Sequence, residues 1–188
     1  MPIILLFSLF ALLVFLFVQF VLNQYKKVPV NKVLIIYGRT PDGEPKYLTE
    51  GTAWVWPFIQ KAAYLDLTPI RLVIRLKDVR NRKKESIYVA ANVTVAISSN
   101  EDLVMEAANR FLTLTNDKIG YLAQDIVKRQ LMIDFTSLDL DELYEDWKST
   151  IGFLSYNIEK ELNKVGLELI NFNISEIQRN PKSNTKFY

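Results

Sequence analysis

The side chains best suited to acid–base chemistry form one acidic group late in the sequence. Paired carboxylates can act as general acid and general base when their pKa values differ. The same residue types are also favoured in the first turn of a helix, where the macrodipole stabilises negative charge. Apolar residues at helical spacing follow the group, so we interpret it as a helix start and not as a catalytic pair. Its members are Asp139, Asp141, Glu142, Glu145 and Asp146.

Cysteine and histidine are both absent from the 188 residues. Disulfides, thiol nucleophiles, Cys/His zinc sites and histidine-dependent triads are therefore excluded. A metal could be held only by oxygen ligands, and no acidic run has the spacing of a calcium loop. We predict that the protein is not an enzyme and has no catalytic residue, no metal and no cofactor.

The densest basic stretch could bind phosphate groups. It comprises Arg71, Arg75, Lys77, Arg80, Arg82, Lys83 and Lys84. Clustered Lys and Arg near a cytoplasmic leaflet attract anionic lipids, at about 1 kcal/mol per charge. A solvated hairpin tip is the simpler interpretation of these charges. The anionic-lipid candidates, which include two lysines nearer the N-terminus, are Lys26, Lys27, Arg80, Arg82, Lys83 and Lys84.

Nucleic acid is not an expected partner. The formal net charge is only +2, from 23 basic and 21 acidic side chains. A nucleic-acid binder needs a larger basic excess to offset several phosphates. The basic stretch is also not interleaved with stacking aromatic residues.

An aromatic segment gives the second candidate site. Trp54, Trp56 and Phe58 surround Pro57, and Trp is favoured at the interface between membrane and water. The alternative is that the two tryptophans pack a sheet, since alternate residues of a strand share one face. Both interpretations fit the spacing. The three aromatic residues are our membrane-interface candidates.

The N-terminal segment has the composition of a membrane anchor. Residues 2–22 contain no charged side chain, and a helix of that length spans roughly 30 Å, the thickness of a hydrocarbon core. A cleaved signal peptide would have a basic start and a shorter apolar stretch. Lys26, Lys27 and Lys32 follow the run, so we expect a single-pass protein of the cell membrane with a cytoplasmic C-terminal domain.

The first half of the body has the patterns of β-structure. A polar exit from the membrane covers residues 23–31, and residues 77–85 form a charged hairpin loop. Residues 87–97 alternate as a half-exposed antiparallel strand does. Strands are expected at 33–37, 52–56, 63–67, 71–76 and 87–97.

The second half has helical spacing. Ser99 or Asn100 starts a first helix, and a second begins near residues 115–116. Its expected buried positions are Ile119, Leu122, Ala123, Ile126, Val127 and Leu131, with Asp125 and Arg129 paired on the outer side. A third helix covers residues 140–165, its apolar stripe serving the core and not a partner.

Gly166 is placed to end this third helix as a left-handed cap. Residues 167–177 then form a closing strand, and a polar tail begins at residue 179. Strands followed by helices and a last strand predict an α+β fold, with helices covering one face of an antiparallel sheet.

The ordered set of segments resembles the SPFH or Band-7 superfamily of stomatin, prohibitin, flotillin and HflK/C proteins, and flotillins in particular. The resemblance covers residues 23 to about 177. It is carried by residues 25–39, the aromatic strand–turn–strand at 51–59 and 63–67, the helical middle at 107–112 and 123–131, and the close at 143–146 and 162–169.

The resemblance implies a membrane scaffold that self-associates and organises lipids and proteins in membrane microdomains. Its expected partners are the lipid bilayer and further copies of the chain. The alternative is a stomatin- or prohibitin-like regulatory subunit of another integral membrane protein, a protease or a channel. Expected boundaries are 1–24 for the transmembrane anchor, 25–178 for the SPFH domain and 179–188 for the tail.

Two features depart from the family pattern. The domain is usually followed by a long Glu- and Ala-rich coiled coil, whereas about ten polar residues follow it here. The hairpin around residues 79–86 is basic where a glycine-containing turn is usual. The resemblance therefore covers the domain and not the coiled-coil assembly module.

Overall fold

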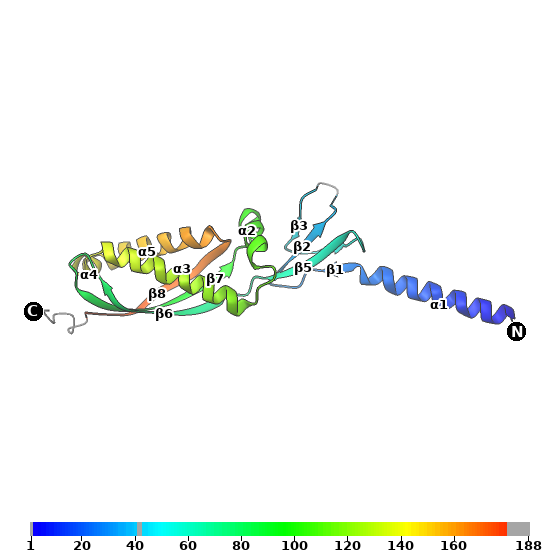
Figure 1. Cartoon of the computed structure of the whole chain (residues 1–188), viewed down its shortest axis with the longest axis horizontal. Helices are drawn as coiled ribbons and strands as arrows, with labels where there is room; N and C mark the ends of the chain where they lie inside the picture. The colour runs from blue at the N-terminus through cyan, green and yellow to red at the C-terminus, as the bar shows by residue number, and fades with distance from the viewer. Residues whose placement is uncertain (1, 41–42, 180–188) are drawn as a thin grey trace, which may run out of the picture. The chain divides into compact units, whose positions relative to one another are not determined.

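The computed structural model describes residues 2–40 and 43–179. The chain folds as two compact units, one ending at Leu65 and the other beginning at Asp66. Both combine strands with helices, and the predicted α+β class is confirmed (Figure 1). The polar tail predicted from residue 179 falls almost wholly on residues 180–188, outside the described residues.

The first unit begins with helix α1 (Pro2–Asn23). Two small sheets follow it. Strand β1 (Tyr25–Lys27) pairs with β4 (Thr52–Trp54). In the other sheet, β2 (Lys32–Gly38) lies between β3 (Lys46–Leu48) and β5 (Gln60–Asp66).

Strand β2 supplies the core of the first unit. Its run Val33–Ile36 is buried on both faces, as a continuous β-branched and apolar sequence allows in a central strand. Leu34 and Ile36 pack with Val28 and Val55, which flank the two-stranded sheet. The core therefore holds both small sheets together.

Three predictions for this unit need correction. The polar exit contains strand β1, and β3 was not predicted; both strands have only three residues, too few to show a clear alternation. The strand expected at 52–56 ends at Trp54. Beyond it, the Trp56 amide donates to the side chain of Gln60 at 2.9 Å and no longer to a neighbouring strand.

The second unit is one antiparallel sheet with helices across one face (Figure 1). Its strand order is β6–β7–β8, so β7 is central. Helices α3 and α5 pack against each other, with α3 against β6 and α5 against β8. The strands are β6 (Ile70–Arg80), β7 (Ser86–Ile97) and β8 (Leu167–Arg179), and the helices are α2 (Glu101–Phe111), α3 (Asn116–Ser137), α4 (Leu140–Glu145) and α5 (Trp147–Asn163).

The β6–β7 hairpin is longer than the sequence indicates. Residues 77–80, predicted as loop, continue β6, and the loop is only Asn81–Glu85. A bulge between Leu76 and Val79, with Asp78 in the left-handed region at φ 57°, lets the strand continue past charged residues.

The alternation of buried and exposed side chains is clearest in β6 and weaker in β7. In β6 buried and exposed side chains alternate as far as Leu76. The half-exposed face predicted for β7 is partly wrong, because Ala90 and Ala96 on its outward face are buried. Both are small, and β7 has a neighbouring strand on each side.

The helices follow their predicted starts, with two corrections. Asn100 caps α2 by accepting from the Asp102 amide at 3.1 Å, and α3 begins directly after Thr115. Leu122 is 41% exposed and not a core residue. The third predicted helix is two helices, because Asp146 leaves helical geometry at φ −130° and caps α5 through the Ser149 amide.

Gly166 ends the helical region as predicted, at φ 82°. Its backbone also lies close to α2. A Cβ at this position would be 2.5 Å from the Leu103 carbonyl oxygen and 2.5 Å from the Ala107 nitrogen. Glycine is thus required both by backbone conformation and by space.

Candidate membrane-contact and binding sites

Helix α1 has the dimensions of a membrane span. It covers 22 residues, about 33 Å at 1.5 Å per residue. Its stretch Leu6–Asn23 has a mean hydropathy of 2.4, and none of it is buried against the rest of the protein. In the described residues it is the one helix long and apolar enough to cross a bilayer.

The predicted aromatic residues lie together beside the end of this helix. The Tyr25 ring meets Trp54 edge-on at 5.7 Å between centroids, and Trp54 meets Trp56 in the same way at 6.5 Å. Val55 between them is buried and holds the segment to the core. The rings of Tyr25, Trp54 and Trp56 therefore form a row that Val55 anchors to the core.

Phe58 forms the tip of this aromatic segment. Its side chain is 98% exposed and its backbone is left-handed at φ 72°, which is uncommon for a bulky residue. The turn is closed on both sides, because the Gln60 amide donates to the Trp56 carbonyl at 3.1 Å and the Gln60 side chain accepts from the Trp56 amide. The fold holds an apolar ring away from the core.

A groove of about 550 Å³ lies beside the two tryptophans. Its apolar wall contains Trp54, Trp56, Ile36 and Leu48, from strands β2, β3 and β4 and the segment after β4. Polar atoms at its rim come from Thr40, Glu44, Lys46 and Gln60.

The lysines near the anchor belong to the same small sheet as Trp54. Lys26 pairs with Ala53 and Lys27 with Thr52 across the β1–β4 ladder. The Tyr64 hydroxyl donates to the Lys27 carbonyl at 3.2 Å and fixes the strand. The first unit thus brings together two predicted lipid-binding lysines and the predicted aromatic residues.

The other basic candidates lie in the second unit, on the β6–β7 hairpin. Lys83 is held by two carboxylates, with its Nζ 2.7 Å from Asp139 Oδ2 and 2.6 Å from Asp141 Oδ2. Arg82 lies 3.6 Å from Asp139, and Arg179 bonds Asp141 at 2.6 Å. Two of the four hairpin cations are therefore already paired. Arg80 and Lys84 are exposed and have no ion pair in the described part of the chain.

These pairs shift proton affinities in the expected directions. The hydrogen bond from Lys83 lowers the pKa of the Asp139 carboxyl, and Lys83 with Arg179 lowers the pKa of Asp141. The two carboxylates raise the pKa of the Lys83 amine. Asp139 and Asp141 thus form a structural clamp between the hairpin loop and the start of α4. Asp139 also accepts from the Asp141 amide at 3.2 Å, as a helix cap does, while the side chain of Glu142 lies outside the described residues.

One buried carboxyl stands apart from this clamp. Asp134 on α3 is buried and accepts through Oδ1 from Gln130 at 2.9 Å and from Asn157 at 3.0 Å. Its Oδ2 has no partner among the described residues. Burial raises the pKa of Asp134, against the effect of the two amides. No group of three or more potential metal ligands occurs within residues 2–40 and 43–179.

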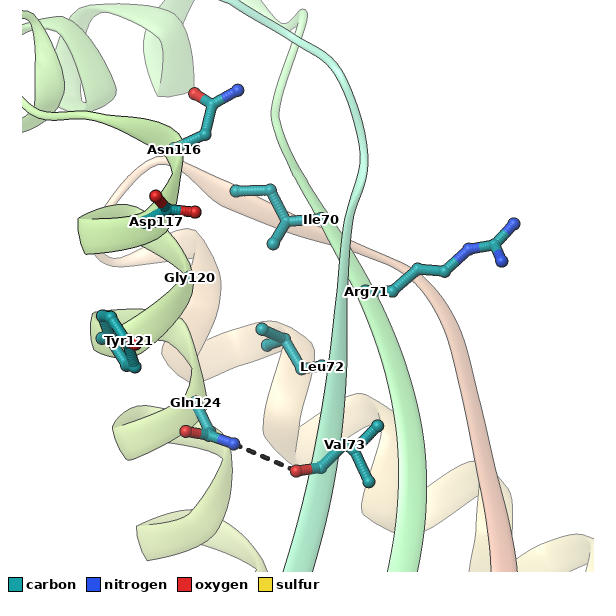
Figure 2. Close-up of a pocket in the computed structure, with 9 residues that line it drawn as sticks. All are labelled: Ile70, Arg71, Leu72, Val73, Asn116, Asp117, Gly120, Tyr121 and Gln124. Carbon is teal, nitrogen blue, oxygen red and sulfur yellow. Dashed lines mark hydrogen bonds between the residues drawn. The ribbon is translucent and has the colours of Figure 1, made fainter.

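A second groove lies between α3 and the outer edge of β6 (Figure 2). Its volume is about 300 Å³. The Gln124 side chain donates to the Val73 carbonyl at 3.0 Å across the groove. Gly120 opens the space, and Tyr121 stands beside it, 74% exposed.

The family model "SPFH domain / Band 7 family" matches residues 26–186. The chain belongs to this family. It is 21% identical over 148 residues to Flotillin-2 of Carassius auratus, an alignment that covers 78% of this chain and 35% of the relative. It is 22% identical over 156 residues to Flotillin-2a of Danio rerio, with 82% and 36% covered. The chain spans about one third of the length of these curated relatives.

Within this SPFH protein, the sequence indicated the aromatic segment and the basic residues as candidates, but it did not indicate the groove beside β6. Gly120, Tyr121 and Gln124 form an ordinary helical sequence, and nothing local indicates an edge strand next to them. The only available signal was the exposed alternation of Arg71, Val73 and Arg75 in a strand with buried positions between.

Proposed function

We propose that this protein is a membrane-anchored, flotillin-like scaffold that self-associates and organises lipids and proteins in membrane microdomains. The observation that carries the proposal is the uncharged helix α1, whose apolar span is not buried against the rest of the protein and which is directly joined to an SPFH domain. Residues 1–24 are the anchor, 25–178 the domain and 179–188 a tail in this proposal. The work of the protein is binding and not catalysis.

The aromatic segment is proposed to rest in the membrane interface. Helix α1 ends at Asn23, and Tyr25, two residues later, touches Trp54. The tryptophans therefore lie close to the level at which the helix leaves the bilayer. Exposed Trp56 and Phe58 supply the apolar and amphipathic surface favoured at that depth.

The basic residues are proposed to bind anionic headgroups in two places. Lys26 and Lys27 follow the anchor within four residues of Asn23 and favour a cytoplasmic domain. On the hairpin, Arg80 and Lys84 take this role, because Arg82 and Lys83 are engaged with Asp139. This narrows the hairpin candidates from four residues to two.

Topology is testable because the chain has no cysteine. Ser99 is exposed at the start of α2, so Ser99→Cys introduces a single accessible thiol. We expect a membrane-impermeant maleimide to label it only after permeabilisation of cells. Labelling of intact cells would place the domain outside and reject the cytoplasmic assignment.

Self-association is tested by crosslinking the full-length chain in membranes and sizing it after gentle detergent extraction. A control chain carries an unrelated single-pass helix in place of α1 and separates assembly by the domain from assembly by the anchor. We expect a ladder of large species with both chains. A monomer would reject the scaffold, and a one-to-one complex with another membrane protein would assign a regulatory subunit instead.

A further inference from the structure

The outer edge of β6 is an unpaired strand edge that opens into the groove beside α3. Strand β6 pairs with β7 on one side, and in the described residues no strand lies on the other. An exposed edge of this kind is a template for an added strand. We propose that an extended acidic peptide of a partner protein binds here as a fourth strand, with two carboxylates four residues apart.

The backbone of β6 is oriented for this addition. The Val73 carbonyl points toward α3 and away from β7 (Figure 2), where it accepts from Gln124 at 3.0 Å. In an antiparallel ladder the N–H and C=O of one residue point the same way, and the direction alternates along the strand. Arg71 and Arg75 share the direction of Val73, so the amide groups of three residues face an incoming strand, which would replace Gln124 at the Val73 carbonyl.

The groove leaves room for that strand. Gly120 lines the α3 wall of the groove without a side chain, and a Cβ at this position would lie 3.3 Å from Ile70 Cγ2, so a larger residue would narrow the space. The exposed ring of Tyr121 forms the wall next to this opening. Side chains of an added strand that face the helices would meet Tyr121 and Leu72, a surface suited to small apolar residues.

Charge decides which peptide fits. The side chains of Arg71 and Arg75 are exposed on the sheet face opposite the helices, and neither forms an ion pair among the described residues. Their neighbours on β7, Thr94 and Ala90, are uncharged. A strand added on the other side would place its alternate side chains next to both arginines, and opposite charge at such positions is stabilising.

A second copy of β6 is a poor occupant for the same reason. An antiparallel pair centred on Val73 would set Arg71 of one copy opposite Arg75 of the other, twice. Like charges directly opposite each other destabilise a strand pair. Asp117 lines the groove on its α3 side, whereas the Arg71 side chain points away from α3 (Figure 2), so the peptide carboxylates belong on the arginine face of the sheet and not on the side facing α3.

The test uses the full chain in nanodiscs of zwitterionic lipid and a labelled peptide with the core Glu-Val-Thr-Val-Glu. Fluorescence anisotropy should give saturable binding, and the matched peptide Lys-Val-Thr-Val-Lys should bind at least tenfold more weakly. Hydrogen exchange followed by mass spectrometry should slow in peptides covering β6. The double variant Arg71→Glu/Arg75→Glu should lose at least tenfold in affinity for the acidic peptide and gain affinity for the basic one.

The control variant Lys148→Glu/Lys160→Glu makes the same change of net charge on α5, and we expect it to bind the acidic peptide within twofold of the wild type. Equal binding of both peptides, or equal loss in the control variant, would overturn the proposal. Concentration-dependent pairing of β6 between copies would also overturn it. So would a result in which the arginine reversal changes binding only to anionic vesicles, since the arginines would then be a lipid surface.

Discussion

Replacing Gly166 by alanine should strongly destabilise the second unit. Two costs add at this position. At φ 82° an L-residue is strained by about 1–2 kcal/mol relative to glycine. The new Cβ would also lie 2.5 Å from backbone atoms of Leu103 and Ala107, inside van der Waals contact.

The steric cost cannot be relieved by rotating a side chain, because the nearest atoms are backbone. Either α2 or the α5–β8 connection must move, and overpacking of this kind costs typically about 1–3 kcal/mol. The Ser98 amide donates to the Gly166 carbonyl at 3.2 Å and would move with it. We therefore expect a loss of about 2–5 kcal/mol in the free energy of unfolding, a large part of a typical domain's about 5–15 kcal/mol.

The matched control is Gly152→Ala in α5. A Cβ there meets nothing within 4 Å, and the position is exposed and helical. Alanine in an exposed helix is more stable than glycine by about 0.5–1 kcal/mol. The same substitution should thus have opposite signs fourteen residues apart.

The assay is urea unfolding of each full-length variant in neutral detergent micelles, followed by far-UV circular dichroism. Hydrogen exchange of peptides from α2 and β8 then shows whether the loss falls on the second unit. A loss below about 1 kcal/mol for Gly166→Ala would refute the reasoning. It would mean that α2 does not lie against this glycine as described.

Three further predictions concern charge and membrane contact. Lys83→Met should lower the free energy of unfolding at pH 7 and speed amide hydrogen exchange in residues 81–85. Because Lys83 lowers the pKa values of Asp139 and Asp141 in the folded state, the stability difference between wild type and variant should disappear as pH falls below their ordinary value of 3.8. Urea unfolding midpoints measured across pH check this. Burial raises the pKa of Asp134 in the folded state, so wild-type stability falls as pH rises through that pKa. Asp134→Asn removes this loss, so the variant should gain stability over the wild type at neutral pH and not in acid. A stability difference that does not depend on pH would contradict this. Phe58→Ser should change the free energy of unfolding by less than about 0.5 kcal/mol because the side chain is exposed, yet reduce quenching of tryptophan fluorescence by brominated lipids; unchanged quenching would remove the aromatic tip from the membrane.

The sequence alone determined the features that depend on neighbouring residues. An uncharged apolar run of this length favours a continuous helix, because a helix satisfies all backbone hydrogen bonds within the segment, so α1 follows from residues 2–22 directly. The Asn100 cap and the Asp125–Arg129 pair, at 2.6 Å, depend only on spacing within one helix. Gly166 could be assigned its left-handed role, but the contact with α2 that makes it irreplaceable joins residues about sixty apart.

Only the tertiary structure decided which strands pair and which charges remain available. Strands of three residues such as β1 and β3 carry too little local pattern to be recognised, and they are strands because a partner supplies their hydrogen bonds, which for β1 is β4, more than twenty residues away. The sequence indicated Lys83 as a candidate lipid-binding cation. In the fold its amine is paired with Asp139 and Asp141, which lie more than fifty residues away in the sequence. The peptide site proposed at Arg71 and Arg75 depends on the position of β6 at the sheet edge beside α3, which is a consequence of strand order. Strand order depends on long-range packing, which the local sequence pattern does not specify.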